Sequence, residues 1–299
     1  MPSAELAPLV AQLKAHPLLA QIATVPIPLA EARKGFDDFK DMFPTGPEIR
    51  TESVDAFGVA AELIAAPGAS TDRALLFFHG GGFVIGSVHS HRELCARLSK
   101  ATGEQVLLVD YRRGPEHPFP AALDDCVTAY RWSLEYKELD PRRIAFIGDS
   151  AGGGLTLSTM LRAKERGVPL PACGIGFSAW VDLACTGKDP AHPDELITRH
   201  GLREMGRLYL GGADPRTPLA SPLYAELGGL PPIYLQVGTA EVLLDDSHRL
   251  LAKAKAAGLD VTLDEWPHLF HVFQLYPILP ECGEAIDKVA GFVRRHLAN

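Results

Sequence analysis

The sequence predicts an α/β protein whose mostly parallel central sheet is flanked by helices. Compact apolar runs rich in β-branched and aromatic residues, typical of buried strands, recur at residues 74–78, 106–109 and 144–148. Amphipathic stretches separate these runs, and strands that alternate with helices are typical of a parallel sheet. With 299 residues, the chain is long enough for one large domain of this class and a small accessory part.

Short helices and no strand are expected in the first 45 residues. Apolar residues recur there at near-helical spacing from Leu6 to Leu18, and a second amphipathic stretch follows Pro28. We interpret residues 1–45 as a helical cap segment and residues 46–299 as the main domain.

The main domain combines strand and helix patterns in alternation. Besides the three buried runs, strand patterns lie at residues 53–57, 59–65, 173–180, 233–238 and 261–266. A helix is expected after Ser150, and other helical patterns lie at residues 94–101, 121–136, 245–257 and 282–296. Residues 182–225 break the alternation, because they are rich in proline, glycine and charge around one helical piece near residues 196–210. We interpret this segment as an insertion that adds to the cap.

The charge balance disfavours two classes of partner. The chain has 29 Lys and Arg against 37 Asp and Glu, a formal net charge of −8. An acidic protein repels phosphate backbones and anionic lipid surfaces, so we expect neither nucleic acid nor a membrane as partner.

The cysteines and the N-terminus suggest a reducing compartment. The five cysteines are odd in number and scattered without a C-x-x-C pair, which favours neither a disulfide framework nor a zinc site. The N-terminus lacks the basic and uninterrupted apolar regions of a secretion signal, and no apolar run approaches the length of a membrane span. We therefore expect a cytoplasmic protein.

The sequence GDSAG at residues 148–152 is the sharpest local signal for chemistry. It follows a strand pattern directly and precedes a helix, the setting in which flanking glycines allow a tight turn that exposes a serine hydroxyl above the sheet. Ser150 is therefore a candidate nucleophile. A G-x-S-x-G sequence can also arise by chance in a glycine-rich protein, so the other features must decide.

The sequence HGGG at residues 79–82 follows another buried strand. Glycine amides can approach an oxyanion closely, and the amide after the nucleophile supplies a further donor. We expect Gly80, Gly81 and Ala151 to form an oxyanion hole, with Gly82 shaping the loop. A phosphate-binding loop is disfavoured, because no Gly-Lys-Ser/Thr follows and Ile85 occupies the place of a required glycine.

A serine nucleophile needs a base and an acid, which follow it in this fold class in the order serine, acid, histidine. Two histidines, His268 and His271, follow the last predicted strand, and three acids, Glu241, Asp245 and Asp246, follow the strand before it. The carboxyl ends of such strands converge on the active site. The residues alone leave the choice among these candidates open.

Neither a metal nor an organic cofactor is expected. Residues 174–179 match G-x-G-x-x-A with Asp194 downstream, but they lie within a predicted strand with no helix after it, unlike a dinucleotide site. His89 and His91 form an H-x-H pair near the glycine loop, but no third ligand is evident.

With HGGG, GDSAG and the later HVF at residues 271–273, the chain resembles the bacterial esterases related to hormone-sensitive lipase, family IV of the α/β-hydrolases. The resemblance spans about residues 70–275. It implies an α/β-hydrolase fold with Ser150 as nucleophile, His271 as base, an acid about thirty residues before it, and a possible homodimer. Glu241 stands at that place where most members carry Asp, and Asp245 is the alternative acid.

We therefore expect a serine carboxylesterase that acts on small ester substrates through an acyl-enzyme, without a cofactor. The small cap and the lack of an interfacial amphipathic helix favour short-to-medium acyl chains. A lactone or amide hydrolase with the same triad is an alternative. A non-catalytic ligand-binding receptor is another, disfavoured because His271 stands in the expected motif.

Overall fold

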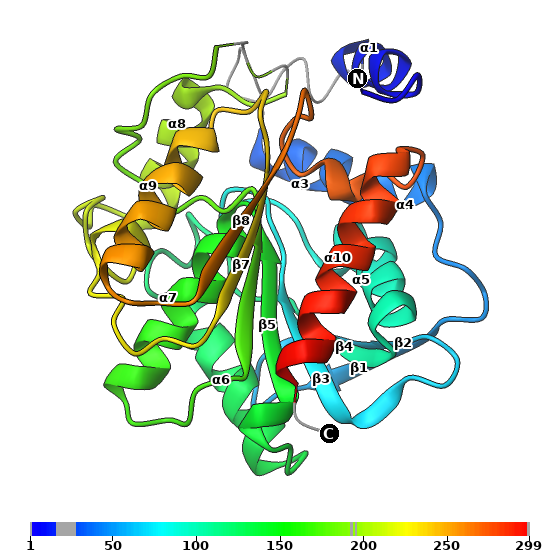
Figure 1. Cartoon of the computed structure of the whole chain (residues 1–299), viewed down its shortest axis with the longest axis vertical. Coiled ribbons are helices and arrows are strands. Elements are labelled where there is room, and N and C mark those ends of the chain that lie inside the picture. Colours follow the sequence, from blue (N-terminus) through cyan, green and yellow to red (C-terminus); the bar gives the residue numbers. More distant parts are fainter. Residues whose placement is uncertain (1, 16–27, 192–193, 195, 298–299) are drawn as a thin grey trace.

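The computed structural model describes residues 2–15, 28–191, 194 and 196–297. At its centre lies an eight-stranded sheet in the order β1-β2-β4-β3-β5-β6-β7-β8 (Figure 1). The strands are β1 (Arg50–Asp55), β2 (Ala60–Ala65), β3 (Ser70–Phe78), β4 (Glu104–Val109), β5 (Ile144–Asp149), β6 (Cys173–Phe177), β7 (Ile233–Gly238) and β8 (Val261–Trp266). The pairs β1–β2 and β2–β4 are antiparallel, and the other neighbouring strands of the sheet, β3 to β8, pair in parallel. The predicted α/β class with a mostly parallel sheet is confirmed.

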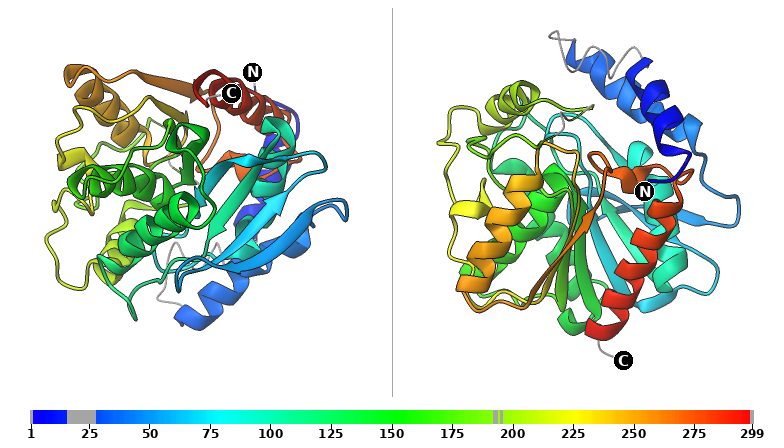
Figure 2. Two further views of the ribbon diagram at one scale, coloured as in Figure 1. Left: turned by 90° about the horizontal axis from the view of Figure 1, so that it is seen from below. Right: turned by 45° about the horizontal axis from the view of Figure 1, so that its top comes forward.

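Helices cover both faces of the sheet because the buried strands are apolar on both sides. Along β3, Leu75 and Phe77 join the core beneath α5 and α10, whereas Leu76 and Phe78 join the core beneath α6, α7 and α9. Figure 2 shows the red α10 and the orange α9 on opposite sides of the sheet. These helices are α5 (Val88–Thr102), α6 (Ala121–Glu135), α7 (Ala151–Glu165), α9 (Leu244–Ala256) and α10 (Pro280–His296).

The N-terminal segment forms α1 (Leu6–Ala15), α3 (Leu29–Asp37) and the short α4 (Phe39–Met42). Residues 16–27, which include part of the helical pattern expected up to Leu18, lie outside the described residues. The α1 helix buries leucines in the core that it shares with α5 and α10. The α3 helix packs Ala32 on Val84 and Ile85, in the loop that follows β3.

Arg33 fixes α3 to that loop. Its guanidinium donates to the carbonyl oxygens of Val84 (2.9 Å) and Gly114 (2.8 Å) and binds both carboxylate oxygens of Glu116 (2.8 and 2.7 Å). Charged donors on two carbonyls and a bidentate carboxylate are among the stronger polar contacts in proteins. Arg33 therefore adds polar contacts to the apolar packing that holds α3 in place.

The insertion between β6 and β7 carries one long helix, α8 (Arg199–Leu210). Thr198 caps the N-terminus of α8, its hydroxyl accepting from the Gly201 amide at 3.0 Å. Tyr209 on α8 stacks on Phe83, with ring centroids 3.9 Å apart. In Figure 1, α8 and α3 lie toward the same end of the molecule.

We predict that Arg33→Ala lowers the free energy of unfolding by about 1–3 kcal/mol, because it removes charged hydrogen bonds that the two carbonyls accept. Urea denaturation measures this change. Lys34→Ala is the matched control, since Lys34 is exposed and forms a local ion pair with Asp38, four residues along the chain. Equal midpoints for both variants and the wild type would contradict the anchoring role of Arg33.

Candidate active site

The turn between β5 and α7 holds Ser150 in a conformation that few residues adopt. Its φ of 52° and ψ of −117° are unusual outside glycine, and such strain persists only where the surroundings enforce it. The Ser150 amide donates to the Phe177 carbonyl (2.8 Å), and the Ser150 carbonyl accepts from the Trp180 amide (2.9 Å). The end of β6 and the segment after it therefore hold this turn on both sides of the serine.

The glycines on either side of Ser150 are required by space. A Cβ at Gly152 would lie 1.8 Å from the Phe78 carbonyl oxygen, and one at Gly148 would lie 2.3 Å from the Gly152 carbonyl oxygen. Because Gly152 has no Cβ, the start of α7 can lie directly against the end of β3. As a result, the serine and the glycine loop after β3 are neighbours.

A buried carboxylate next to the serine organises the glycine loop. Asp149 accepts a hydrogen bond from the Gly80 amide at 2.8 Å, and its other oxygen lies 3.3 Å from His91 Nε2. The opposite ring nitrogen of His91 lies 2.9 Å from the Ser90 hydroxyl. His91, noted in the sequence only as one half of an H-x-H pair, therefore supports Asp149.

This arrangement changes the expected oxyanion donors. The Gly80 amide, which the sequence analysis placed in the oxyanion hole, already donates to Asp149. Gly81 and Gly82 line the same cavity as Ser150, and neither amide donates to another residue of the described part of the chain. Gly82 therefore takes the place of Gly80 as a candidate donor.

His271 and Glu241 meet beside the serine. His271 Nδ1 lies 3.2 Å from Glu241 Oε2, and the glutamate is fully buried in the loop after β7. Burial works to lower the pKa of His271, but the hydrogen bond and the charge of Glu241 outweigh it and raise the pKa above its usual value. His271 and Ser150 line one cavity, although no hydrogen bond joins their side chains among the described residues. Such contacts are often long in the absence of substrate.

The other candidates for base and acid lie apart from this pair. Asp245 stands in the first turn of α9, where it pairs with Arg249 Nε at 2.9 Å and accepts from the Lys188 amide. Asp246 pairs with the same arginine at 2.7 Å. His268 is exposed, and its backbone amide donates to the Thr239 hydroxyl.

The cavity at Ser150 is small and mostly apolar, with a volume of about 90 Å³. Phe36 of α3 forms part of its wall. Four residues on or just before α8 form another part: Leu196, Ile197, Leu202 and Met205. Both segments interpreted as a cap from the sequence thus contribute to the wall of this cavity.

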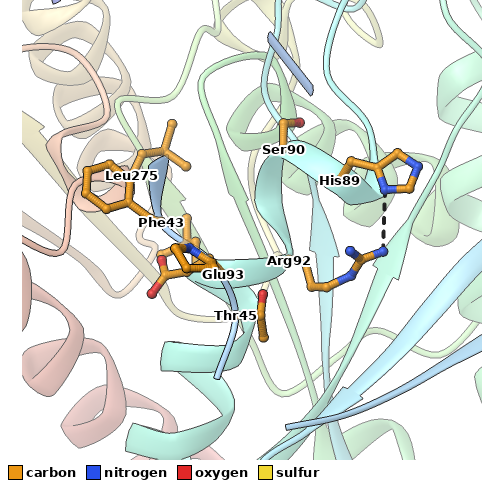
Figure 3. Close-up of a pocket in the computed structure, with 9 residues that line it drawn as sticks. Phe43, Thr45, His89, Ser90, Arg92, Glu93 and Leu275 are labelled. Atoms are coloured by element: carbon orange, nitrogen blue, oxygen red, sulfur yellow. Dashed lines mark hydrogen bonds between the residues drawn. The ribbon is translucent and has the colours of Figure 1, made fainter. Parts of the chain in front are cut away.

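A second cavity has a volume of about 240 Å³, and Figure 3 shows the residues that line it. Leu275 lines both cavities, and Phe43 in the second contacts Tyr276 in the first, with ring centroids 6.3 Å apart. On the polar side of the second cavity, His89 Nδ1 accepts a hydrogen bond from Arg92, and Arg92 also binds Glu62. The two cavities are therefore adjacent.

The described residues offer neither a metal site nor a membrane-spanning helix. Within them, no cluster of three or more metal-ligating side chains is placed to hold a cation. No helix among them has both the length and the apolar character needed to cross a membrane. Residues 174–177 of the G-x-G-x-x-A match lie in β6, and the chain turns at Ser178 without opening a helix.

Known proteins resemble this chain over most of its length. A family model described as the alpha/beta hydrolase fold matches residues 75–275. An acetyl-hydrolase of Streptomyces hygroscopicus is 45% identical over 232 residues, which cover 76% of this chain and 77% of that protein. An esterase of Acinetobacter venetianus is 34% identical over 266 residues, 87% of each chain. The crystal structure of an esterase from the bacterial hormone-sensitive lipase family matches all of both chains, with 40% identity and a TM-score of 0.92.

We predict that His271 titrates with a midpoint above the ordinary 6.5, because Glu241 stabilises the imidazolium. Glu241→Gln keeps the size of the side chain and removes its charge, so the midpoint should fall. Imidazole NMR signals followed against pH measure both values, and the remaining histidines serve as internal controls. A midpoint that does not move in the Gln variant would show that Glu241 does not act on His271.

Proposed function

Because the chain belongs to the α/β-hydrolase family, and within it to the bacterial esterases related to hormone-sensitive lipase, we propose that it hydrolyses short-to-medium acyl esters through an acyl-enzyme. One observation carries the proposal. Ser150, on its strained turn, shares a cavity with His271, and the histidine is bonded to the buried Glu241. A serine, a base and an oriented acid in this order are the components of acyl transfer.

In the proposed reaction, His271 Nε2 accepts the hydroxyl proton as Ser150 Oγ attacks the ester carbonyl. The proton then passes from His271 to the leaving alcohol as the acyl-enzyme forms. A water molecule repeats the two steps, with His271 again taking and returning the proton, and releases the carboxylic acid. Glu241 keeps the proton of the neutral imidazole on Nδ1 and stabilises the imidazolium. No further reactant is required.

The amides of Gly81, Gly82 and Ala151 are the proposed oxyanion donors. Ala151 is the first residue of α7, so the positive end of the helix dipole adds to its effect. The loss of one such donor in other acyl-transfer enzymes lowers kcat by about 10²–10³-fold. Asp149, by holding Gly80, keeps the following two amides free for this role.

The cavity supports a preference for small acyl groups. Its volume of about 90 Å³ and its apolar lining suit a short hydrocarbon chain better than a long one. The name of the similar Streptomyces protein, an acetyl-hydrolase, points the same way. We also propose that residues 1–45 and 182–225 form a cap over this cavity, because Phe36 and α8 line it. The possible homodimer and the cytoplasmic location stay predictions.

Among the acids, the proposal assigns the catalytic role to Glu241 and not to Asp245. The first is within hydrogen-bond distance of His271, whereas the second is paired with Arg249 at the start of α9. The assignment is tested in the following experiment, in which Asp245 provides the matched control.

We predict that the protein hydrolyses p-nitrophenyl acetate and butyrate faster than the palmitate, because the cavity is small. Ser150→Ala and His271→Ala should lower kcat by about 10⁴-fold or more, and Glu241→Ala by about 10³–10⁴-fold. Asp245→Ala should keep activity within a few-fold of the wild type. Initial rates and circular dichroism of each variant provide the measurement. A larger loss for Asp245→Ala than for Glu241→Ala would reverse the assignment of the acid.

A fluorophosphonate probe should label the wild type and spare Ser150→Ala, because only an activated serine is phosphonylated. Intact mass measures the added group. Labelling without hydrolysis of any ester in the series would indicate a lactone or amide substrate. A folded wild type that takes no label would favour a binding role, as in a receptor.

A further inference from the structure

A second carboxylate, Asp194, lies behind the Glu241–His271 pair, in the segment that leads to α8. Its Oδ2 accepts a hydrogen bond from the Val242 amide at 3.0 Å. Its Oδ1 accepts from the amides of Leu196 (2.9 Å) and Ile197 (3.1 Å). All three of these partners are donors, which suits an ionised carboxylate.

The three amides belong to two parts of the candidate site. Val242 directly follows Glu241, so its amide fixes the backbone that carries the proposed acid. Leu196 and Ile197 both line the cavity at Ser150. A single side chain therefore joins the acid loop after β7 to the inserted segment that forms the cavity wall.

Capping of α8 does not explain this aspartate. Thr198 already performs that function through its hydroxyl and the Gly201 amide. Asp194 stands before this cap and reaches the loop of Glu241, 48 positions away in the sequence at Val242. Its contacts are thus directed to the site and not to the helix alone.

We propose that Asp194 is a positioning residue for the ester hydrolysis proposed above: it fixes the Glu241 loop and adds negative charge that supports the imidazolium of His271. The inference rests on that proposed function. Asp194 acts through Glu241 and His271 and needs no contact with the substrate.

The charges around His271 agree with this role. Three carboxylates act to raise the pKa of His271: Glu241 after β7, Asp194 before α8 and Asp149 at the end of β5. Burial raises the pKa of Asp194 itself, against the effects of His271 and of the three amides, which favour the charged form. His91, beside Asp149, is a further titratable group that faces this cluster.

The test is Asp194→Asn, which keeps the shape of the side chain but removes its charge and one acceptor. The new NH₂ group must face at least one backbone amide, so the loop loses a hydrogen bond. We expect kcat for p-nitrophenyl butyrate to fall about tenfold, with KM changed less than about threefold. The acid limb of the kcat/KM profile should move to lower pH, because the imidazolium loses a supporting charge.

Asp182→Asn is the matched control. Asp182 is a buried aspartate of the same insertion that accepts from the Ala184 and Thr186 amides, but it pairs with Arg249 and does not act on His271. This variant should lose thermal stability without a shift of the acid limb. If Asp194→Asn behaves in the same way, Asp194 has only a structural role and the inference is wrong.

Asp194→Glu provides a second test and serves if the Asn variant does not fold. It keeps the charge but displaces it by one bond, so kcat should fall while the acid limb stays near that of the wild type. An unchanged kcat would contradict the positioning role. Wild type and Ser150→Ala are measured beside these variants. An inactive wild type would refute the proposed function. If the wild type is active and the acid limb of Asp194→Asn does not shift, only the inference about Asp194 is refuted.

Discussion

The close contact of the β5–α7 turn with the end of β3 is the constraint on which the site depends. No side chain fits at Gly152, because a Cβ there would collide with the Phe78 carbonyl oxygen. That contact brings Ser150 next to the glycine loop, and it lets Asp149 bind the Gly80 amide directly. The candidate nucleophile and the proposed oxyanion donors are therefore positioned by close backbone contacts between the start of α7 and the end of β3, in the core of the fold.

Buried negative charge is the second organising feature. Asp149, Asp194 and Glu241 come from three separate segments and act on one histidine. Backbone amides donate to Asp149 and Asp194, which offsets part of the cost of burying these two charges, whereas Glu241 is bonded to His271 through Oε2 alone. Together these charges favour the imidazolium form of His271, which is the form that the proposed reaction requires after the attack of Ser150.

Much of the fold and the turn that carries the candidate nucleophile could be predicted because they are encoded locally. The buried runs of β3, β4 and β5 and the turn at Ser150 are patterns within ten residues of sequence, set by hydrophobic burial and by the space that glycine leaves. The α/β class and the order of its elements follow from the same patterns. Spacing, together with family resemblance, was sufficient to bring Glu241 and His271 forward as partners.

Contacts between distant segments were decided by the tertiary structure alone. Glu241 and Asp245 are four positions apart and equally acidic, but Arg249 holds one of them at the start of α9 and leaves the other beside His271. The Gly80 amide is occupied by a residue 69 positions away, and Asp194 acts on the loop of an acid far along the chain. Sequence determines which residues can do this chemistry, because burial and turn geometry are local, whereas packing determines which of them meet.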